Sequence, residues 1–329
     1  MTTPEDLRLF ALEDTRAFGE AVARALGIAL AGHEERRFED GEHKARPLES
    51  VRGKDVFVVQ SLHGEPGRSV NDKLVTLLFF LACLKDAAAG RVTAVIPYLA
   101  YARKDRKTQT RDPVTTRYVA ALIEAAGTER VLALDVHNPA AFQNAFRCGT
   151  EHLEARPLFA RHAARLVGAG EVAVVSPDTG GAKRAEALRA SLARLLARPV
   201  ASAFAEKYRA RGEVTGGLLV GEVAGRVALI VDDLISTGGT IARAARACRA
   251  AGARAVHALA THGLFVGGAK EMFAEPALAE VVVTNSVPPL HLERAQHGAK
   301  LVVLDVAPLF AEAIGRLHRG GSLAELLEP

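Results

Sequence analysis

The sequence predicts an α/β protein whose sheets are mainly parallel and flanked by helices. Short runs rich in β-branched residues recur along the chain, and segments with helical length and periodicity separate them. Near-continuous apolar strands that alternate with helices are typical of a parallel sheet covered on both faces. The same order of elements returns in the second half of the chain, which predicts two similar domains in tandem.

The strands are expected where apolar runs end in polar or turn residues. In chain order they are 55-DVFVVQ-60, 91-RVTAVIPY-98, 130-RVLALDVH-137, 171-EVAVVSPD-178, 227-VALIVDD-233, 254-RAVHALATH-262, 281-VVVTNS-286 and 300-KLVVLDV-306. Helices are expected over 71–90, 114–127 and 240–252. Each of these segments ends in glycine, which predicts a glycine cap at the helix C-terminus.

The length of 329 residues suggests two domains, at roughly 100–200 residues per domain. A repeated order of strand, loop, helix and strand covers Val56–Tyr98 and again Val227–His262. We therefore expect an N-terminal domain over 1–150 and a C-terminal domain over 151–329, with the junction near 148–156. The last helix is expected to pack back on the N-terminal domain.

Composition excludes several classes of protein. Hydrophobic residues make up 49% and charged residues 24%, as in an ordinary globular chain. The longest apolar run, Leu74–Leu84, has 11 residues, whereas a membrane-spanning helix needs about 20. No secretory signal is visible at the N-terminus, and the three cysteines form no C-x-x-C pair. We therefore expect a cytoplasmic protein with no membrane segment, no disulfide framework and no cysteine zinc site.

The net charge favours a small anionic ligand. Lysine and arginine number 42 against 38 acidic residues, giving +4, and ten of the basic residues are lysine. Aromatic residues make up only 5%, and there is no long basic block, so no nucleic-acid partner is expected. A phosphorylated small molecule is the better hypothesis.

The segment 230-IVDDLISTGGTI-241 carries the strongest chemical signal. An apolar strand runs into two carboxylates, then into a turn with two glycines and three hydroxyls, then into a helix. Such a turn directs backbone N–H groups and a helix N-terminus at one point, where a phosphate can bind. Asp232 and Asp233 lie at the carboxyl end of the strand, where ligands bind in open α/β sheets, and can accept hydrogen bonds from sugar hydroxyls. The alternative is a capped β–α turn with two solvated acids.

The pattern D-D-x-x-x-T-G-G-T resembles the signature of phosphoribosyltransferase-fold proteins. Further segments occur in the order found in the ribose-phosphate pyrophosphokinase family, and the chain resembles that family from about residue 38 to its end. They are 38-FEDGE-42, 96-IPYLAYARKDRK-107, 135-DVHNP-139, 176-SPDTGGAKR-184 and 261-THGLF-265. The resemblance implies two tandem phosphoribosyltransferase-like domains.

The resemblance also implies which residues of this chain bind ATP. The implied set is Phe38, Asp40, Glu42, Arg103, Lys104, Asp105 and His137. The first three match a strip that binds adenine from a neighbouring subunit, so the family implies a homo-oligomer, at least a dimer. From the residues alone, 38–42 is a turn around Gly41 and 103–107 is an exposed charged patch.

The C-terminal half supplies the rest of the implied site. Ribose 5-phosphate is implied to bind Asp232, Asp233, Ser236, Thr237, Gly238, Gly239 and Thr240, and the diphosphate to bind a loop of Asp178, Thr179, Gly180 and Gly181. His137 and Asp178 match the family's residues near Mg²⁺, the implied cofactor. A dication shared with phosphates needs only one or two carboxylates. Without the family, a lone histidine and a Pro-Asp-Thr-Gly turn are often structural.

Lys207 and Arg209, in 205-AEKYRARGE-213, match the basic pair of the family's mobile catalytic loop. With His137 they are the implied catalytic residues, because phosphoryl transfer depends on positioning and on neutralising charge. Read without the family, the stretch is a solvated charged loop. Three departures stand out: Ser236 replaces the usual Asp, Lys104 replaces the usual Gln, and 61–73 is longer than usual.

The implied reaction is transfer of the β,γ-diphosphate of ATP to the anomeric hydroxyl of ribose 5-phosphate, which gives phosphoribosyl pyrophosphate and AMP. Two alternatives stay open. A non-catalytic paralogue that regulates an active synthetase should have lost catalytic residues, and only Ser236 points that way. A salvage phosphoribosyltransferase needs a base-binding hood, for which no sequence feature is found. A dehydrogenase is disfavoured, because the chain has no G-x-G-x-x-G turn.

Overall fold

The computed structural model describes residues 6–210, 213–293 and 297–328. It divides into two compact units. Unit 1 comprises residues 1–153 and 306–326, and unit 2 comprises residues 154–305 and 327–329. The chain passes from the first unit to the second after Leu153, and Val306 begins the segment that returns to the first.

Unit 1 contains a five-stranded parallel sheet in the order β1-β4-β5-β6-β7 and a separate antiparallel hairpin, β2–β3. Its strands are β1 (Leu7–Ala11), β2 (His33–Arg37), β3 (His43–Pro47), β4 (Asp55–Val59), β5 (Arg91–Ile96), β6 (Arg130–Leu134) and β7 (Gly149–Leu153). Its helices are η2 (Glu13–Thr15), α1 (Arg16–Leu26), α2 (Val70–Asp86), α3 (Thr115–Ala125), α4 (Pro139–Ala145) and α10 (Ala307–Arg319). The short helix η4 (Ala324–Leu327) follows near the C-terminus.

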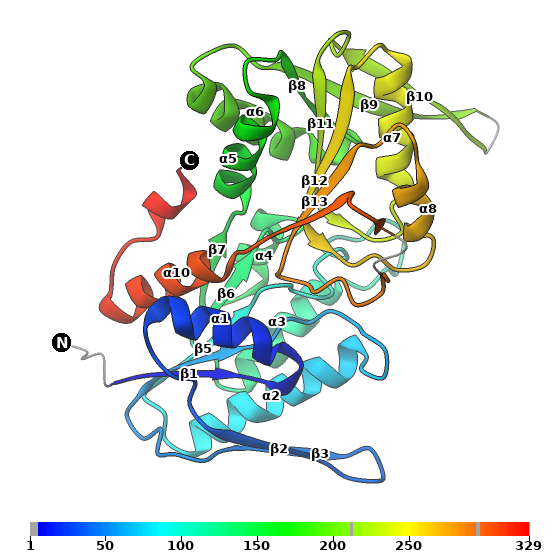
Figure 1. Ribbon diagram of the computed structural model, residues 1–329. Coiled ribbons are helices and arrows are strands. Elements are labelled where there is room, and N and C mark those ends of the chain that lie inside the picture. Colours follow the sequence, from blue (N-terminus) through cyan, green and yellow to red (C-terminus); the bar gives the residue numbers. More distant parts are fainter. Residues whose placement is uncertain (1–5, 211–212, 294–296, 329) are drawn as a thin grey trace. The chain divides into compact units, whose positions relative to one another are not determined.

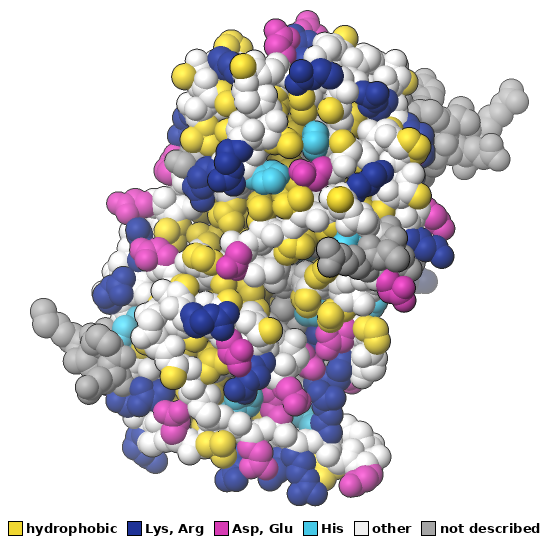
Figure 2. All heavy atoms as spheres, in the orientation of Figure 1, with side chains coloured by type: hydrophobic (Ala, Val, Ile, Leu, Met, Phe, Trp, Pro, Cys, Tyr) yellow, Lys and Arg dark blue, Asp and Glu magenta, His cyan; other side chains and the backbone are white. Residues whose placement is uncertain are grey.

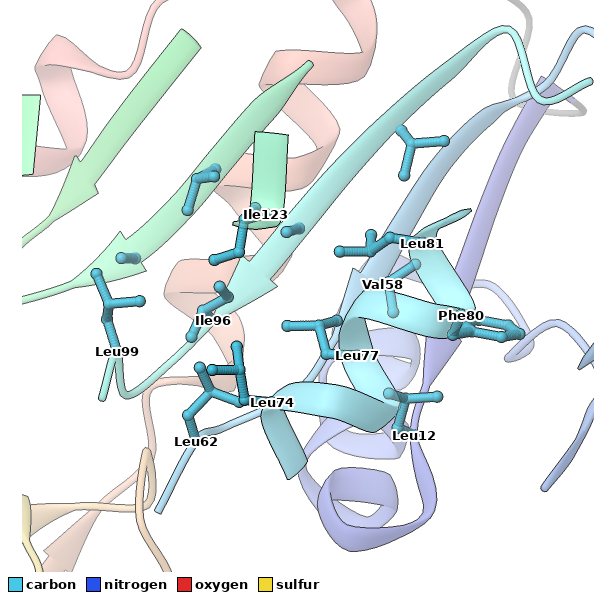
Figure 3. Close-up of a cluster of buried hydrophobic side chains, with 14 of the residues drawn as sticks. Leu12, Val58, Leu62, Leu74, Leu77, Phe80, Leu81, Ile96, Leu99 and Ile123 are labelled. Atoms are coloured by element: carbon cyan, nitrogen blue, oxygen red, sulfur yellow. The ribbon is translucent and has the colours of Figure 1, made fainter. Parts of the chain in front are cut away.

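Helix α2 forms because both its start and its buried face are specified by the sequence. Ser69 caps it: the Ser69 hydroxyl accepts from the Asp72 N–H (3.2 Å), and the Asp72 carboxylate accepts from the Ser69 N–H (2.8 Å). Leu77, Phe80 and Leu81 then bury one face of the helix against the sheet. Figure 3 shows these side chains packed with Val58 of β4 and Ile96 of β5. This core fixes the carboxyl ends of the strands, where the candidate site residues lie.

Helix α10, near the C-terminus, packs on unit 1. Helix α10 lies beside α1 (Figure 1), and the rings of Phe18 and Phe310 meet edge to face at 5.5 Å. His318 of α10 contacts the buried Asp55 carboxylate at 2.7 Å, and Arg91 forms an ion pair with the same carboxylate. These contacts attach the C-terminal helix to the amino ends of β4 and β5.

Unit 2 contains a seven-stranded sheet in the order β10-β9-β8-β11-β12-β13-β14. All neighbours are parallel except β9 and β10, which form an antiparallel pair. Its strands are β8 (Val172–Ser176), β9 (Ala201–Ala210), β10 (Glu213–Gly221), β11 (Val227–Ile235), β12 (Ala255–Gly263), β13 (Glu280–Thr284) and β14 (Leu301–Leu304). Its helices are α5 (Arg156–Val167), η3 (Thr179–Gly181), α6 (Ala182–Leu196), α7 (Gly239–Ala250) and α8 (Ala269–Ala274).

The predicted α/β class is confirmed, and each predicted strand and helix has a counterpart, with shifts of a few residues at the ends. Gly127 and Gly252 adopt positive φ directly after the C-caps of α3 and α7, as expected of terminating glycines. The prediction for Gly90 was wrong, because α2 ends earlier, at Asp86 with Ala87 as its C-cap. Gly90 instead allows a close approach: an added Cβ would fall 2.7 Å from the carbonyl oxygen of Gly53.

The helices and one face of the surface can be compared with the composition. No helix in the described part of the chain is both long enough and apolar enough to span a bilayer. On the face drawn in Figure 2, basic and acidic side chains are interspersed.

Candidate functional site

The turn between β11 and α7 is the clearest candidate site in unit 2. Strand β11 lies between β8 and β12, so its carboxyl end is interior to the sheet. Gly238 is the N-cap of α7, and its carbonyl accepts a hydrogen bond from the Ala242 N–H (2.9 Å). No side chain caps this helix start. The first N–H groups of a helix have no intrahelical acceptor, so the turn offers donors to an anion.

Gly238 is required here for two reasons. Its φ of +77° lies in the left-handed region, which L side chains rarely adopt. A Cβ at this position would fall 2.7 Å from both Cβ and Sδ of Met272 in α8. Gly239 is not strained in this way: its added Cβ would lie 3.4 Å from the Arg243 guanidinium and 4.0 Å from the Thr237 hydroxyl oxygen. The first glycine therefore shapes the turn, and the second leaves space beside it.

Asp232 and Asp233 form a close, largely buried acid pair at the end of β11. Their side chains are 22% and 4% exposed, and the Asp233 N–H donates to Oδ1 of Asp232 at 2.9 Å. Burial, together with the charge of Asp233, raises the pKa of Asp232 to about 7. Arg184 of α6 lies against both carboxylates, a contact that the sequence analysis did not predict.

The second candidate turn follows β8. Asp178 caps η3, and its Oδ1 accepts from the N–H groups of Gly180 (3.0 Å) and Gly181 (3.2 Å). The family resemblance implies that this loop binds a diphosphate, whereas in the structure the carboxylate of Asp178 accepts from both N–H groups. An added Cβ on Gly181 would fall 2.8 Å from the Ser176 hydroxyl oxygen, so this glycine is needed for close packing. Thr179 lies inside the same 3-10 turn.

In unit 1, the segment that follows β5 carries Arg103, Lys104 and Asp105. Arg103 is exposed, and Lys104 and Asp105 are half-buried. The Lys104 ammonium forms an ion pair with Asp112 and donates to the Thr108 hydroxyl at 2.9 Å. The bond from Lys104, with those from Thr108, holds the pKa of Asp112 well below its usual range. Lys104 therefore orders its own loop through Asp112, a partner that the sequence analysis missed.

The same segment contacts the end of β6. The Asn138 amide donates to Oδ2 of Asp105 at 2.6 Å, and Asn138 also caps α4 by accepting from the Ala141 N–H at 3.2 Å. His137 precedes it in an exposed bend. Asp135, just before, has a φ of +38°, which is uncommon for a residue with a side chain. The structure therefore brings Asp105 and the segment of His137 together, and Asn138 is the link.

The predicted adenine strip forms the loop of the β2–β3 hairpin. The Phe38 N–H donates to the Glu42 carbonyl at 2.8 Å, and the Glu42 N–H donates to Oδ1 of Asp40 at 3.1 Å. Phe38 is half-buried, and the guanidinium carbon of Arg36 lies 4.9 Å from the centre of its ring. Arg36 thus covers a face of the ring by a cation–π contact.

The segment with Lys207 and Arg209 is a strand and not the loop that the sequence indicated. In the backbone register of β9 and β10, Lys207 is opposite Gly217 and Arg209 is opposite Val214. The two strands pair with a register shift between Val214 and Gly217. Local charge does not predict this pairing. The side chains of residues 206–218 lie outside the described part of the structure.

Comparison with known proteins identifies the family. Residues 7–127 match the N-terminal domain of ribose phosphate pyrophosphokinase, and residues 207–328 match the phosphoribosyl synthetase-associated domain. A ribose-phosphate pyrophosphokinase from Caldanaerobacter subterraneus is 40% identical over 97% of this chain and 97% of its own length. The chain belongs to the ribose-phosphate pyrophosphokinase family. A Staphylococcus aureus relative of the same name is 39% identical over 98% of this chain and 97% of its own length.

A solved structure supports the fold assignment. The crystal structure of phosphoribosylpyrophosphate synthetase from Mycobacterium smegmatis matches with a TM-score of 0.86 and 35% identity. The match covers 96% of this chain and 100% of the other. The phosphoribosyltransferase-like fold that the sequence predicted is therefore confirmed for both halves of this pyrophosphokinase family member.

The residues present fit a magnesium ion that is shared with phosphates. Within the described residues, no group of three or more His, Cys, Asp or Glu side chains is placed to hold a metal by itself. Mg²⁺ in phosphoryl-transfer sites is usually held by one or two carboxylates together with substrate phosphates and water. Asp178, a carboxylate on a loop at a strand end, is a hard oxygen donor of the required type.

Proposed function

We infer that this chain is a ribose-phosphate pyrophosphokinase: it transfers the β,γ-diphosphate of ATP to ribose 5-phosphate. The anomeric oxygen attacks the β-phosphorus, the bond from that phosphorus to the α,β-bridging oxygen breaks, and AMP leaves with the electron pair. The hydroxyl proton is released, and the product is phosphoribosyl pyrophosphate. The observation that carries this function is the β11–α7 turn, in which an acid pair precedes an uncapped helix N-terminus.

We propose that the 5-phosphate binds the turn formed by Ser236, Thr237, Gly238, Gly239 and Thr240. The uncapped start of α7 supplies backbone donors, and the threonine hydroxyls supply more. The conformation of Gly238 and the absence of a side-chain cap at the start of α7 support the assignment. Ser236 keeps a hydroxyl where most family members have a carboxylate.

Asp232 and Asp233 are proposed to bind the sugar hydroxyls. Ionised carboxylates only accept hydrogen bonds, which matches the vicinal hydroxyls of ribose. Asp232, with a pKa raised to about 7 by burial and by Asp233, is only partly ionised at neutral pH in the ligand-free protein. Hydroxyl donors from ribose favour its charged form, so sugar binding and ionisation of this acid reinforce each other.

Asp178 is proposed to have two successive partners. In the ligand-free structure its carboxylate accepts from the N–H groups of Gly180 and Gly181. A diphosphate at this loop would take over those two donors, and the carboxylate would then be available to Mg²⁺. Magnesium, when bound, supplies positive charge that offsets the charge developing on the transferred phosphates.

ATP is proposed to bind residues of unit 1. Arg103 is exposed and can contact phosphate oxygens, Asp105 is held by Asn138 beside His137, and Phe38 can stack on adenine once Arg36 moves from its ring. His137 is proposed to lie near the triphosphate and the magnesium ion. Lys207 and Arg209 of β9 are proposed to neutralise the transferred group.

A homo-oligomer is proposed on two grounds. The hairpin loop that carries Phe38, Asp40 and Glu42 is the strip that the family shares between subunits. Exposed apolar side chains also lie on two successive crossover helices of unit 1: Val75 and Phe79 on α2, and Tyr118 and Leu122 on α3. The cytoplasm is the proposed location, since all three cysteines are free thiols, as a reducing compartment requires.

One assay tests this function. Purified protein with ATP, Mg²⁺ and ribose 5-phosphate should release AMP and phosphoribosyl pyrophosphate in equal amounts. Unphosphorylated ribose is the matched control, and it should give at least 100-fold lower kcat/KM, because the 5-phosphate contacts are lost. Absence of AMP release from folded protein that still binds ribose 5-phosphate would instead indicate the non-catalytic regulatory paralogue. Release of diphosphate that depends on an added base would indicate a salvage transferase.

A further inference from the structure

Arg184 is the one cation that joins the two candidate turns of unit 2, among the contacts that the structure describes. It lies in the first turn of α6, three residues after Gly181 of the β8 turn. Its Nη1 is 3.2 Å from Oδ1 of Asp233 and 3.4 Å from Oδ1 of Asp232. A single guanidinium nitrogen therefore bridges both acids at the end of the neighbouring strand, β11.

Partial burial limits the access of water to this contact. The Arg184 side chain is 26% exposed, and the two carboxylates are more buried than that. Screening by water is weak where charged groups are buried. The separations of 3.2 and 3.4 Å are longer than those of a short charge-assisted hydrogen bond, so the contact is an ion pair within a partly buried site.

The charged groups around Asp232 are few among the described residues. Asp233 on the same strand opposes its ionisation, and Arg184 on α6 favours it. Strand β8, on one side of β11, has no charged residue. On the other side, His262 of β12 is opposite Leu234 and contacts the Ser286 hydroxyl (2.9 Å); on α7, Arg243 donates to the Thr240 hydroxyl (3.2 Å). Burial and Asp233 raise the pKa of Asp232, and Arg184 is the nearby cation that opposes them.

We propose that Arg184 is a positioning residue for ribose 5-phosphate, which favours the charged form of Asp232 and orients both acids to accept the sugar hydroxyls. It acts through the two acids and fixes them relative to the loop of Gly180 and Gly181, on whose following helix it lies. The proposal rests on the proposed function of the β11–α7 turn. It assigns a role to a residue at the end of the motif 176-SPDTGGAKR-184 for which the sequence analysis gave none.

The test compares Arg184→Gln with Arg184→Lys. Calorimetric binding of ribose 5-phosphate, without ATP, is measured from pH 6 to pH 9 together with kcat and KM. For Arg184→Gln we expect Kd and KM for ribose 5-phosphate to rise about tenfold at pH 7, with kcat changed less than threefold. The pH below which ribose 5-phosphate affinity falls should rise by about one unit, because removal of a close cation raises the pKa of Asp232. Arg184→Lys should restore part of both effects.

Arg189→Gln is the matched control. It removes the same charge from the same helix, but Arg189 pairs with the exposed Glu186 and not with the acid pair. An Arg184→Gln or Arg184→Lys protein with wild-type melting temperature and an unshifted pH profile would overturn the proposal, as would equal losses in Arg189→Gln. If Arg184→Gln does not fold, the pH profile of ribose 5-phosphate binding by Arg184→Lys alone decides whether the proposal stands. Failure of the wild type to bind ribose 5-phosphate would instead refute the proposed function.

Discussion

The two turns at the carboxyl edge of the unit 2 sheet differ in what occupies their backbone donors. They follow adjacent parallel strands, β8 and β11, and both precede helices. In the first turn the carboxylate of Asp178 accepts from Gly180 and Gly181, whereas the start of α7 at Gly238 has no side-chain cap. A Gly-Gly pair after a strand therefore does not by itself mean an open anion site. The acceptor that the chain supplies decides whether the site is open or already occupied.

The glycines of the two turns are also required for different reasons. Gly238 has positive φ and abuts Met272, so it determines backbone conformation. Gly180 and Gly181 do not have positive φ, and their missing side chains leave room for Asp178 and Ser176. Substitutions in the two turns should consequently have different effects: on backbone conformation at Gly238, and on side-chain packing at Gly180 and Gly181.

Gly238→Ala should have the largest effect. The new Cβ must displace Met272 and occupy a left-handed conformation, which costs about 1–3 kcal/mol of stability and deforms the phosphate turn. We expect kcat/KM for ribose 5-phosphate to fall more than 100-fold. Steady-state kinetics and thermal unfolding measure the two effects. Gly225→Ala is the control, since Gly225 has φ +72° but nothing within 4 Å of the added Cβ. Equal kinetic losses in both variants would mean that the turn is not the binding site.

Comparison of Asp178→Ala with Asp178→Asn should separate two roles of Asp178: the N-cap hydrogen bonds that stabilise the turn and the carboxylate charge that supports catalysis. The amide oxygen of Asn can still accept from Gly180 and Gly181, whereas Ala cannot, so only Ala should lose about 1 kcal/mol of stability. Both variants remove the carboxylate. We therefore expect kcat to fall on the order of 10²-fold in both, with more Mg²⁺ needed for half-maximal rate. Urea unfolding and magnesium titration measure these effects. Full activity of Asp178→Asn would show that the cap alone matters.

Asp232→Asn should remove a pH dependence of stability. The folded pKa of Asp232 is about 7, above the unfolded value of 3.8, so the folded protein binds the extra proton between these values. Stability therefore falls as pH rises towards 7. From pH 5.5 to pH 8 the wild type should lose about 2 kcal/mol of unfolding free energy that Asp232→Asn does not lose. Urea unfolding of ligand-free protein at both pH values measures the difference. Parallel pH profiles would show that Asp232 is ionised throughout.

Thr240→Val should have the smallest effect of the four. Valine keeps the shape of threonine but removes a hydroxyl donor from the open turn, so the KM for ribose 5-phosphate should rise about five- to tenfold. Thr240→Ser is the control and should stay within about twofold of wild type. Initial rates at varied ribose 5-phosphate give both values. An unchanged KM in Thr240→Val would leave the backbone as the only source of donors in this turn.

The sequence predicted the α/β class and both strand–turn–helix sites because these depend on local patterns, such as the buried run of β11 and the glycines after it. The hairpin β2–β3 was missed, since HEERR and HKARP show no apolar alternation and lie on a half-exposed surface. Contacts between distant residues were also missed. Asn138 lies 33 residues from Asp105 in the chain, and only the fold brings them together.

Arg184 illustrates the same limit. It lies 48 residues from Asp232, and nothing in the residues around it marks it as a partner of an acid pair. A sequence shows which residues are charged but not which of them form ion pairs. This pair depends on the register of β8 against β11 and on where α6 begins.

Crystallography of the protein soaked with ribose 5-phosphate gives the most direct check on these assignments. The phosphate should lie against the backbone N–H groups of 237–240, with the ribose hydroxyls on Asp232 and Asp233, while Asp178 still caps Gly180 and Gly181. A phosphate seated at the Gly180–Gly181 turn instead, or electron density absent from 237–240 at saturating ligand, would contradict the assignment of the open turn.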